Sequence, residues 1–209
     1  SSVTYLFGSQ IITTPEDIDK ADNTYKIEDY TIPSFTQFLV AKEAARKDFS
    51  EANVAALNQK IEELKSYQYP YSIVVNINGD PSTRMAFAWF TNDRMTEGKV
   101  QLTPLADLSQ LNTVFDTATD IITVDAVATT TKKIRYAIGL SGIPEATGVP
   151  MSTKYKYTSH KAITQGLIPN TVYAYRVGVE GYWSEVAYFM TAPTNVPDAS
   201  EEFTFIYMT

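Results

Sequence analysis

Hydrophobic residues recur with two different periods along this chain, and the period changes near Tyr69-Pro70. From Ser34 to Leu64 they recur at three- and four-residue spacing, which is typical of amphipathic helices. After Tyr69-Pro70 apolar and polar positions alternate, which is typical of strands with one buried face. The pattern therefore predicts a helical segment followed by an all-β module.

Two short helices, or one kinked helix, are expected over residues 34–68. Ser34 precedes Gln37 by three residues, the spacing of a capping box in which the hydroxyl accepts from a free backbone N–H. Ser50 interrupts the pattern before it resumes. The apolar positions are Phe35, Phe38, Ala41 or Lys42, Ala45, Phe49, Val54, Leu57, Ile61 and Leu64. Because isolated short helices are marginal in water, we expect them to pack against the chain's own sheet; a partner-binding hairpin is the alternative.

Residues 1–33 show little periodicity, so an irregular or weakly ordered lead-in is expected there. Asp17, Asp19 and Glu28 fall at the first, third and twelfth positions of a calcium-binding loop. Asp22 replaces the glycine that the sharp turn of such a loop requires. A solvated acidic loop is therefore the preferred interpretation.

About eight strands are predicted in residues 69–193. They are Tyr71 to Ile77, Met85 to Thr91, Lys99 to Thr103, Ile121 to Ala128, Lys133 to Ile138, Lys154 to Thr164, Thr171 to Glu180 and Glu185 to Thr191. Asn78-Gly79-Asp80-Pro81 forms a turn between the first two. Leu105 to Thr119 is expected to be an insertion and Gly139 to Pro150 a loop. Short strands at this spacing indicate a β-sandwich.

The most informative motif is a Pro-Asn turn that leads into a strand with alternating tyrosines. It reads Leu167-Ile168-Pro169-Asn170-Thr171-Val172-Tyr173-Ala174-Tyr175-Arg176-Val177-Gly178. In a Greek-key sandwich a tyrosine at the place of Tyr173 buries its ring and bonds its hydroxyl to backbone near the preceding corner. Trp89 is expected to fill the space between the sheets. Together with Trp89 and Tyr173, four more residues make up what we call the structural signature of the sandwich: Leu167, Pro169, Thr171 and Tyr175.

Composition narrows the chemistry that these residues can perform. The 209 residues carry a net charge of −7, so we expect no nucleic-acid binding. The sequence has no cysteine and one histidine, His160, which we place on a strand surface or near a loop. One histidine is too few for a multi-histidine metal site. The apolar runs are also too short for a membrane-spanning segment. We therefore assign no catalytic residue and no metal ligand.

Tyr182 and Trp183 form the one candidate binding loop. Exposed aromatic rings there would offer a platform for a carbohydrate or a domain partner. The preferred interpretation is that Trp183 seals the edge of the sandwich, because Trp side chains are usually buried.

Further segments accompany the tyrosine motif, namely Arg84 to Thr91, Lys99 to Gln101, Gly181 to Glu185 and Tyr188 to Pro193. Together they resemble the N-terminal domain of purple acid phosphatases and related bacterial metallophosphoesterases of the calcineurin-like group. The resemblance covers about Tyr71 to Pro193. It implies a mainly β, fibronectin type III-like (immunoglobulin-like) sandwich, here with an N-terminal helical extension.

The resemblance also predicts the character of the residues after the sandwich. Residues 194–209 are expected to be a linker and, from Phe203 to Thr209, the first strand of a metallophosphoesterase domain. In that family the next residue would be the first metal-binding Asp. Two divalent metal ions are accordingly expected in a catalytic domain that this chain does not contain, and no cofactor is expected within it.

The function that the resemblance implies is accessory and non-catalytic. The module would position or stabilise its own downstream catalytic domain in a metal-dependent phosphoesterase. That protein would be exported after removal of a leader and would be periplasmic, extracellular or surface-anchored. The alternative is a stand-alone surface module that binds carbohydrate or protein through Tyr182 and Trp183. A weaker alternative is an adhesin or assembly subunit that uses the helices of Ser34 to Ser66.

Overall fold

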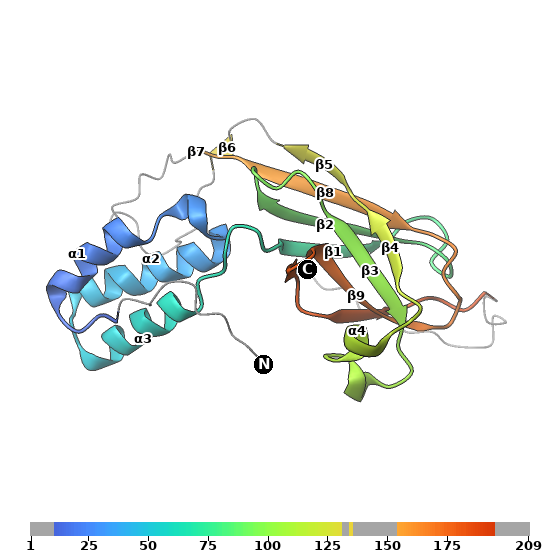
Figure 1. Ribbon diagram of the computed structural model, residues 1–209, viewed down its shortest axis with the longest axis horizontal. Helices are drawn as coiled ribbons and strands as arrows, with labels where there is room; N and C mark the ends of the chain where they lie inside the picture. Colours follow the sequence, from blue (N-terminus) through green and yellow to red (C-terminus); the bar gives the residue numbers. More distant parts are fainter. Residues whose placement is uncertain (1–10, 131–133, 136–153, 195–209) are drawn as a thin grey trace, which may run out of the picture.

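The computed structural model describes residues 11–130, 134–135 and 154–194. Helices α1 to α3 come first and form one part, and two antiparallel sheets come after them and form a β-sandwich (Figure 1). None of the described helices is both long and apolar enough to cross a bilayer.

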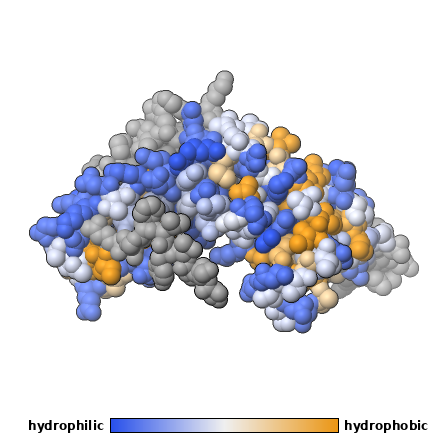
Figure 2. All heavy atoms as spheres, viewed as in Figure 1, coloured by the Kyte–Doolittle hydropathy of each residue, from blue (hydrophilic) through white to orange (hydrophobic). Residues whose placement is uncertain are grey.

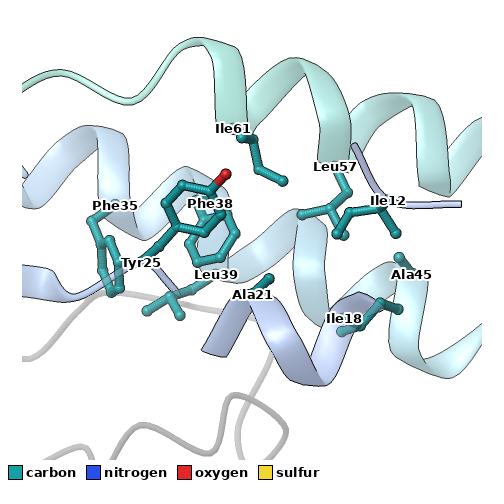
Figure 3. Close-up of a cluster of buried hydrophobic side chains, with 10 residues drawn as sticks. All are labelled: Ile12, Ile18, Ala21, Tyr25, Phe35, Phe38, Leu39, Ala45, Leu57 and Ile61. Carbon is teal, nitrogen blue, oxygen red and sulfur yellow. The ribbon is translucent and has the colours of Figure 1, made fainter. Parts of the chain in front are cut away.

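The helical part has its own hydrophobic core. It is built from α1 (Pro15–Thr24), the short 3₁₀ helix η1 (Ile27–Asp29), α2 (Ile32–Lys47) and α3 (Glu51–Glu62). The buried side chains are Ile12, Ile18, Ala21, Tyr25, Phe35, Phe38, Leu39, Ala45, Leu57 and Ile61 (Figure 3). The expectation that the helices pack against the sheet is therefore wrong. With α1 as an added partner, the helices bury their apolar faces against one another.

Helix α1 also corrects the expectation of an irregular lead-in, which is wrong for Pro15–Thr24. The carboxylate of Asp17 accepts hydrogen bonds from the backbone N–H groups of Thr13 (3.1 Å) and Thr14 (2.9 Å). A hydrogen bond from Lys20, together with these backbone bonds, holds the pKa of Asp17 well below its ordinary value. Asp17 thus closes the helix start and is not part of a solvated acidic loop.

Helix α2 begins two residues earlier than expected, at Ile32, with Thr31 at the N-cap position. Pro33 fits the first turn because its missing N–H needs no partner there. Ser34 has a different role from the predicted cap: its hydroxyl accepts a hydrogen bond from the backbone N–H of Lys65 at 3.1 Å. It thereby ties the start of α2 to the segment after α3. Helix α3 does begin directly after Ser50, as predicted.

The sandwich consists of a first sheet with strand order β1-β2-β8-β5 and a second sheet with order β10-β9-β3-β4, in which β11 also pairs with β9. All pairs are antiparallel. The strands are β1 (Tyr71–Ile77), β2 (Met85–Asn92), β3 (Lys99–Pro104), β4 (Ile122–Asp125), β5 (Val127–Thr130), β8 (Tyr157–Thr164), β9 (Val172–Val179), β10 (Tyr182–Trp183) and β11 (Ala187–Met190). A separate two-stranded sheet pairs β6 (Ile134–Arg135) with β7 (Lys154–Tyr155), also antiparallel.

The expected single strand from Ile121 to Ala128 is wrong, because β4 and β5 belong to different sheets. The chain crosses from one sheet to the other at Ala126, whose N–H donates to the carbonyl of Gly98 at 2.8 Å. The expected insertion from Leu105 to Thr119 carries two short helical turns, η2 (Leu108–Gln110) and α4 (Val114–Thr117). The predicted loop from Gly139 to Pro150 lies outside the described residues.

Arg94, just beyond β2, joins the helical part to the sandwich. Its guanidinium lies over the ring of Tyr67 at 3.6 Å and donates to the backbone carbonyl of Glu28. The carboxylate of Asp29 is 3.9 Å from the same group. The joint therefore combines a cation–π contact with charge-assisted hydrogen bonding.

Candidate functional site

The corner between β8 and β9 is held by the hydroxyl of Tyr173. The ring is buried, and its oxygen accepts a hydrogen bond from the backbone N–H of Ile168 at 3.0 Å. Thr171 donates to the carbonyl of Pro169 at 2.9 Å. Leu167 is buried, and its N–H donates to the carbonyl of Thr83 in the β1–β2 turn. Four of the signature residues thus meet at one corner, where they fix the path of the chain.

The other two signature residues lie between the sheets. Trp89 on β2 is fully buried. Tyr175 on β9 packs its ring against Phe87, with centroids 5.2 Å apart, and burial raises its pKa. Both side chains fill the core.

His160 is not on the surface, as expected from the sequence, but fully buried between the sheets. Its ring stacks on Trp89, with centroids 5.3 Å apart and planes 10° apart. Nε2 lies 2.8 Å from the hydroxyl of Thr91, whereas Nδ1 has no hydrogen-bond partner among the described residues. The imidazole comes this close to the loop before β3 because Gly98 has no side chain there.

Burial lowers the pKa of His160 to about 4, so the imidazole is neutral at neutral pH. Its hydrogen-bond partner, Thr91, is itself buried, and no carboxylate contributes to the pKa shift. A general base needs an accessible substrate proton and an orienting group. The environment of His160 therefore indicates a core residue and not a catalytic one.

The candidate binding loop lies at the other end of β9 from the tyrosine corner. There the guanidinium of Arg176 lies between two rings, 4.6 Å from Trp183 and 4.4 Å from Phe115 of α4. Its Nε donates to the side-chain carbonyl of Gln101 at 2.9 Å. Burial lowers the pKa of Arg176, while Glu180 and Asp116 act in the opposite direction. This stack fastens the 105–119 insertion to the outer face of the second sheet.

Neither aromatic ring of the loop is free. One face of Trp183 packs on Arg176, and its Nε1 is buried without a partner among the described residues. Tyr182 meets Tyr69 edge to face, with ring centroids 5.3 Å apart. These contacts connect the loop to the sheet and to the segment that leads from the helices. They do not form an open, flat platform.

Sequence reasoning missed three residues with structural roles: Arg94, Gly98 and Arg176. Strand alternation could have placed Arg176 on the outer face of β9, because its neighbours Tyr175 and Val177 face the core. The contacts of Arg94 and Gly98 are made across more than sixty residues of sequence, with Glu28 and His160 respectively. No local pattern could have predicted them.

The described part of the chain groups no three His, Cys, Asp or Glu side chains that could hold a metal ion. Carboxylates in this part of the chain form hydrogen bonds that hold local structure. Asp80, for example, accepts hydrogen bonds from Ser82 and Thr83, which lower its pKa.

Solved structures of an fn3 domain, a redesigned β-sandwich and a perforin-like membrane protein are similar to this chain. The fn3 domain of human contactin 1 is 13% identical, with a TM-score of 0.34, and the match covers 62% of this chain and 82% of that one. A redesigned β-sandwich protein is 16% identical, with a TM-score of 0.31 and coverage of 61% and 98%. The vertebrate protein astrotactin-2 is 13% identical, with a TM-score of 0.35 and coverage of 63% and 23%. No curated protein matches the sequence.

One protein family matches the sandwich itself. Its description is "Purple acid Phosphatase, N-terminal domain", and the match runs over residues 70–191. This range holds every strand from β1 to β11 and more than half of the chain. With its sandwich of two antiparallel sheets, the chain belongs to the purple acid phosphatase N-terminal domain family.

Proposed function

We propose that this chain is the non-catalytic accessory part of an exported, metal-dependent phosphoesterase, and that it positions or stabilises a catalytic domain located after it in the same protein. The family match over residues 70–191 is the observation that carries the proposal. Phosphoester hydrolysis by two metal ions needs a set of oxygen and imidazole ligands converging on one site. The described residues supply no such set, so the metal chemistry is assigned to the downstream domain.

The sandwich has the properties of a rigid spacer. Its β8–β9 corner is pinned by Tyr173, and the helical part is attached at the opposite end by Arg94. A domain connected to this sandwich would therefore be held at a defined distance from the helices. Such pre-organisation lowers the entropy lost when domains pack together.

The proposal is tested with the full-length encoded protein, residues 1–194 alone, and the protein without residues 1–194. Hydrolysis of p-nitrophenyl phosphate is measured after metal removal and after addition of divalent ions. We expect metal-dependent activity only where the downstream domain is present, and a lower melting temperature for that domain without residues 1–194. A full-length protein without metal-dependent hydrolysis would contradict the proposal, as would a catalytic domain that is unaffected by the deletion.

Export is part of the same proposal and is tested separately. Fractionation of the source cells with an antibody against residues 1–194 should place the protein outside the cytoplasm. A protein confined to the cytoplasm would contradict this part.

The alternative of a carbohydrate-binding module makes a different prediction for Trp183→Ala. Because Trp183 packs on Arg176, the substitution should lower the stability of the sandwich. A platform would instead lose glycan binding, measured by calorimetry, while stability stayed unchanged.

A further inference from the structure

The last described residues of the chain are held firmly at one end of the sandwich. The hydroxyl of Thr191 donates to the carbonyl of Ile168 at 2.7 Å, and the N–H of Ala192 donates to the carbonyl of Pro81 at 3.0 Å. We call this end the exit end. It comprises the β1–β2 turn, the β8–β9 corner and the end of β11.

The opposite end of the sandwich contacts the helical part and the segment that leads from it. Arg94, two residues after β2, contacts the helical part there, and Tyr182 of β10 contacts Tyr69. In Figure 1 the helices lie at one end of the sheets, away from the β1–β2 turn. The exit end is the end that helices α1 to α3 leave free. The 105–119 insertion leaves β3 at this end, and its Phe115 packs on Arg176.

Large apolar side chains are exposed at the exit end. Ile77 at the end of β1 is 66% exposed, Ile168 at the corner 59%, and Met190 at the end of β11 57%. Figure 2 shows hydrophobic residues gathered over the sandwich, whereas the helical part is mostly hydrophilic on the same face. Exposed apolar surface marks interaction sites where it is contiguous. Because Val127 on β5 is 73% exposed as well, the exit end is singled out by the held chain end together with its apolar side chains.

Several polar groups at this end have internal partners. An exception is Arg84 in the β1–β2 turn, whose Nε is buried without a partner among the described residues. Asp80 accepts from the backbone N–H and hydroxyl of Ser82, at 2.9 and 2.7 Å, and from the hydroxyl of Thr83 at 2.8 Å. The backbone N–H of Ile168 is held by Tyr173. Covering the exit end would therefore bury apolar side chains, and Asp80 and the N–H of Ile168 would need no new hydrogen bonds.

We infer that the exit end is the surface on which the downstream catalytic domain docks, through Ile77, Ile168 and Met190. The inference rests on the proposed function. The occupant is chosen because the last strand ends here, with Thr191 and Ala192 held by hydrogen bonds. A domain tethered at this point has an effective concentration in the millimolar range. A small apolar contact then suffices, whereas a separate partner would need about 800 Å² on each side.

The inference is tested in the full-length protein with the double substitution Ile168→Ser and Met190→Ser. A matched control is Val74→Ser with Ile163→Ser, since these side chains are 48% and 46% exposed on the outer face of the first sheet. The readouts are the melting temperature of the catalytic domain and hydrogen–deuterium exchange at the exit end. Residues 1–194 with the same substitutions show whether the sandwich still folds, and Ile77→Ser is a second variant at this end.

We expect the exit-end variants to remove at least half of the melting-temperature difference between the full-length protein and the isolated catalytic domain, and the control to remove none. Exchange at the exit end should be slower in the full-length protein than in residues 1–194. Equal effects of both pairs, or no effect of the exit-end pair, would overturn the inference while leaving the proposed function intact. If deletion of residues 1–194 itself changes nothing, the proposed function fails.

Discussion

The buried imidazole of His160 makes the stability of the sandwich depend on pH in a calculable way. Burial lowers its pKa from the usual 6.5 to about 4. Below pH 6.5 the unfolded chain therefore binds a proton that the folded chain does not bind. The free energy of unfolding falls as the pH falls from about 6.5 to about 4, and this contribution is constant above that window.

The size of the effect is set by the two pKa values. Each unit of pKa difference corresponds to about 1.4 kcal/mol. Between pH 7.5 and pH 5 the sandwich should lose about 2 kcal/mol from this group, and by pH 4 about 3 kcal/mol. These losses are large compared with the usual stability of a domain, about 5–15 kcal/mol.

Urea unfolding at a series of pH values measures the loss directly. Both tryptophans, Trp89 and Trp183, lie in the sandwich, so their fluorescence reports on its unfolding. The matched variant is His160→Gln, whose amide can keep a hydrogen bond to Thr91 but does not titrate in this range. Carboxylates with lowered pKa values, such as Asp80, add their own pH dependence to both proteins, so the difference between the two isolates His160.

Parallel pH profiles of wild type and His160→Gln would refute the reasoning. A second measurement covers the case in which the variant does not fold. Because the sequence contains one histidine, its imidazole signals in a proton NMR titration need no assignment. A midpoint near 6.5 in the folded protein would likewise show that burial does not hold the ring neutral.

Three further substitutions test contacts that the structure shows. Tyr173→Phe leaves the N–H of Ile168 without its partner and should cost about 1–3 kcal/mol in urea unfolding. Gly98→Ala would place a β-carbon within 3 Å of two buried rings, so about 1–3 kcal/mol of overpacking is expected in the same assay. Arg94→Ala removes the cation–π contact with Tyr67, worth about 1 kcal/mol, and should raise proteolysis between helices and sandwich about five-fold.

Each of these has a control or a contradicting result. Tyr188→Phe, on an exposed ring, should leave stability unchanged; if it costs as much as Tyr173→Phe, the hydroxyl bond is not the cause. Unchanged unfolding of Gly98→Ala would show that the loop before β3 yields to the added methyl. Arg46→Ala removes an arginine that pairs with Asp22 within the helical part, and it should not affect cleavage at the joint.

Much of the sandwich could be predicted because its signals are local. Strand β1 has the expected bounds, since alternation of apolar and polar residues sets which face of a strand is buried. The corner around Tyr173 was also recognisable, because a bond between residues five positions apart depends on a short sequence. Helix α1 carried a usable signal as well: Thr14, Pro15 and Asp17 occupy helix-start positions.

The burial of His160 could not be predicted. Alternation places Thr158, His160, Ala162 and Thr164 on one face of β8, and Lys161 and Ile163 on the other. Hydropathy alone gives no reason to bury a face with threonines and a histidine while exposing an isoleucine. His160 is buried because its ring stacks on Trp89 of the neighbouring strand and fits in the space beside Gly98.

The period of each segment, the tyrosine corner and the family could all be recognised in the amino-acid sequence. Folding in three dimensions was needed to show that the helices form their own core, that the chain changes sheets at Ala126, and that Arg94 and Arg176 are held by aromatic rings. The features recognised in the sequence and those seen only in the tertiary structure differ in the sequence distance over which the underlying interactions act. Side-chain periodicity and capping act within a few residues, whereas packing depends on which distant segments the fold brings together.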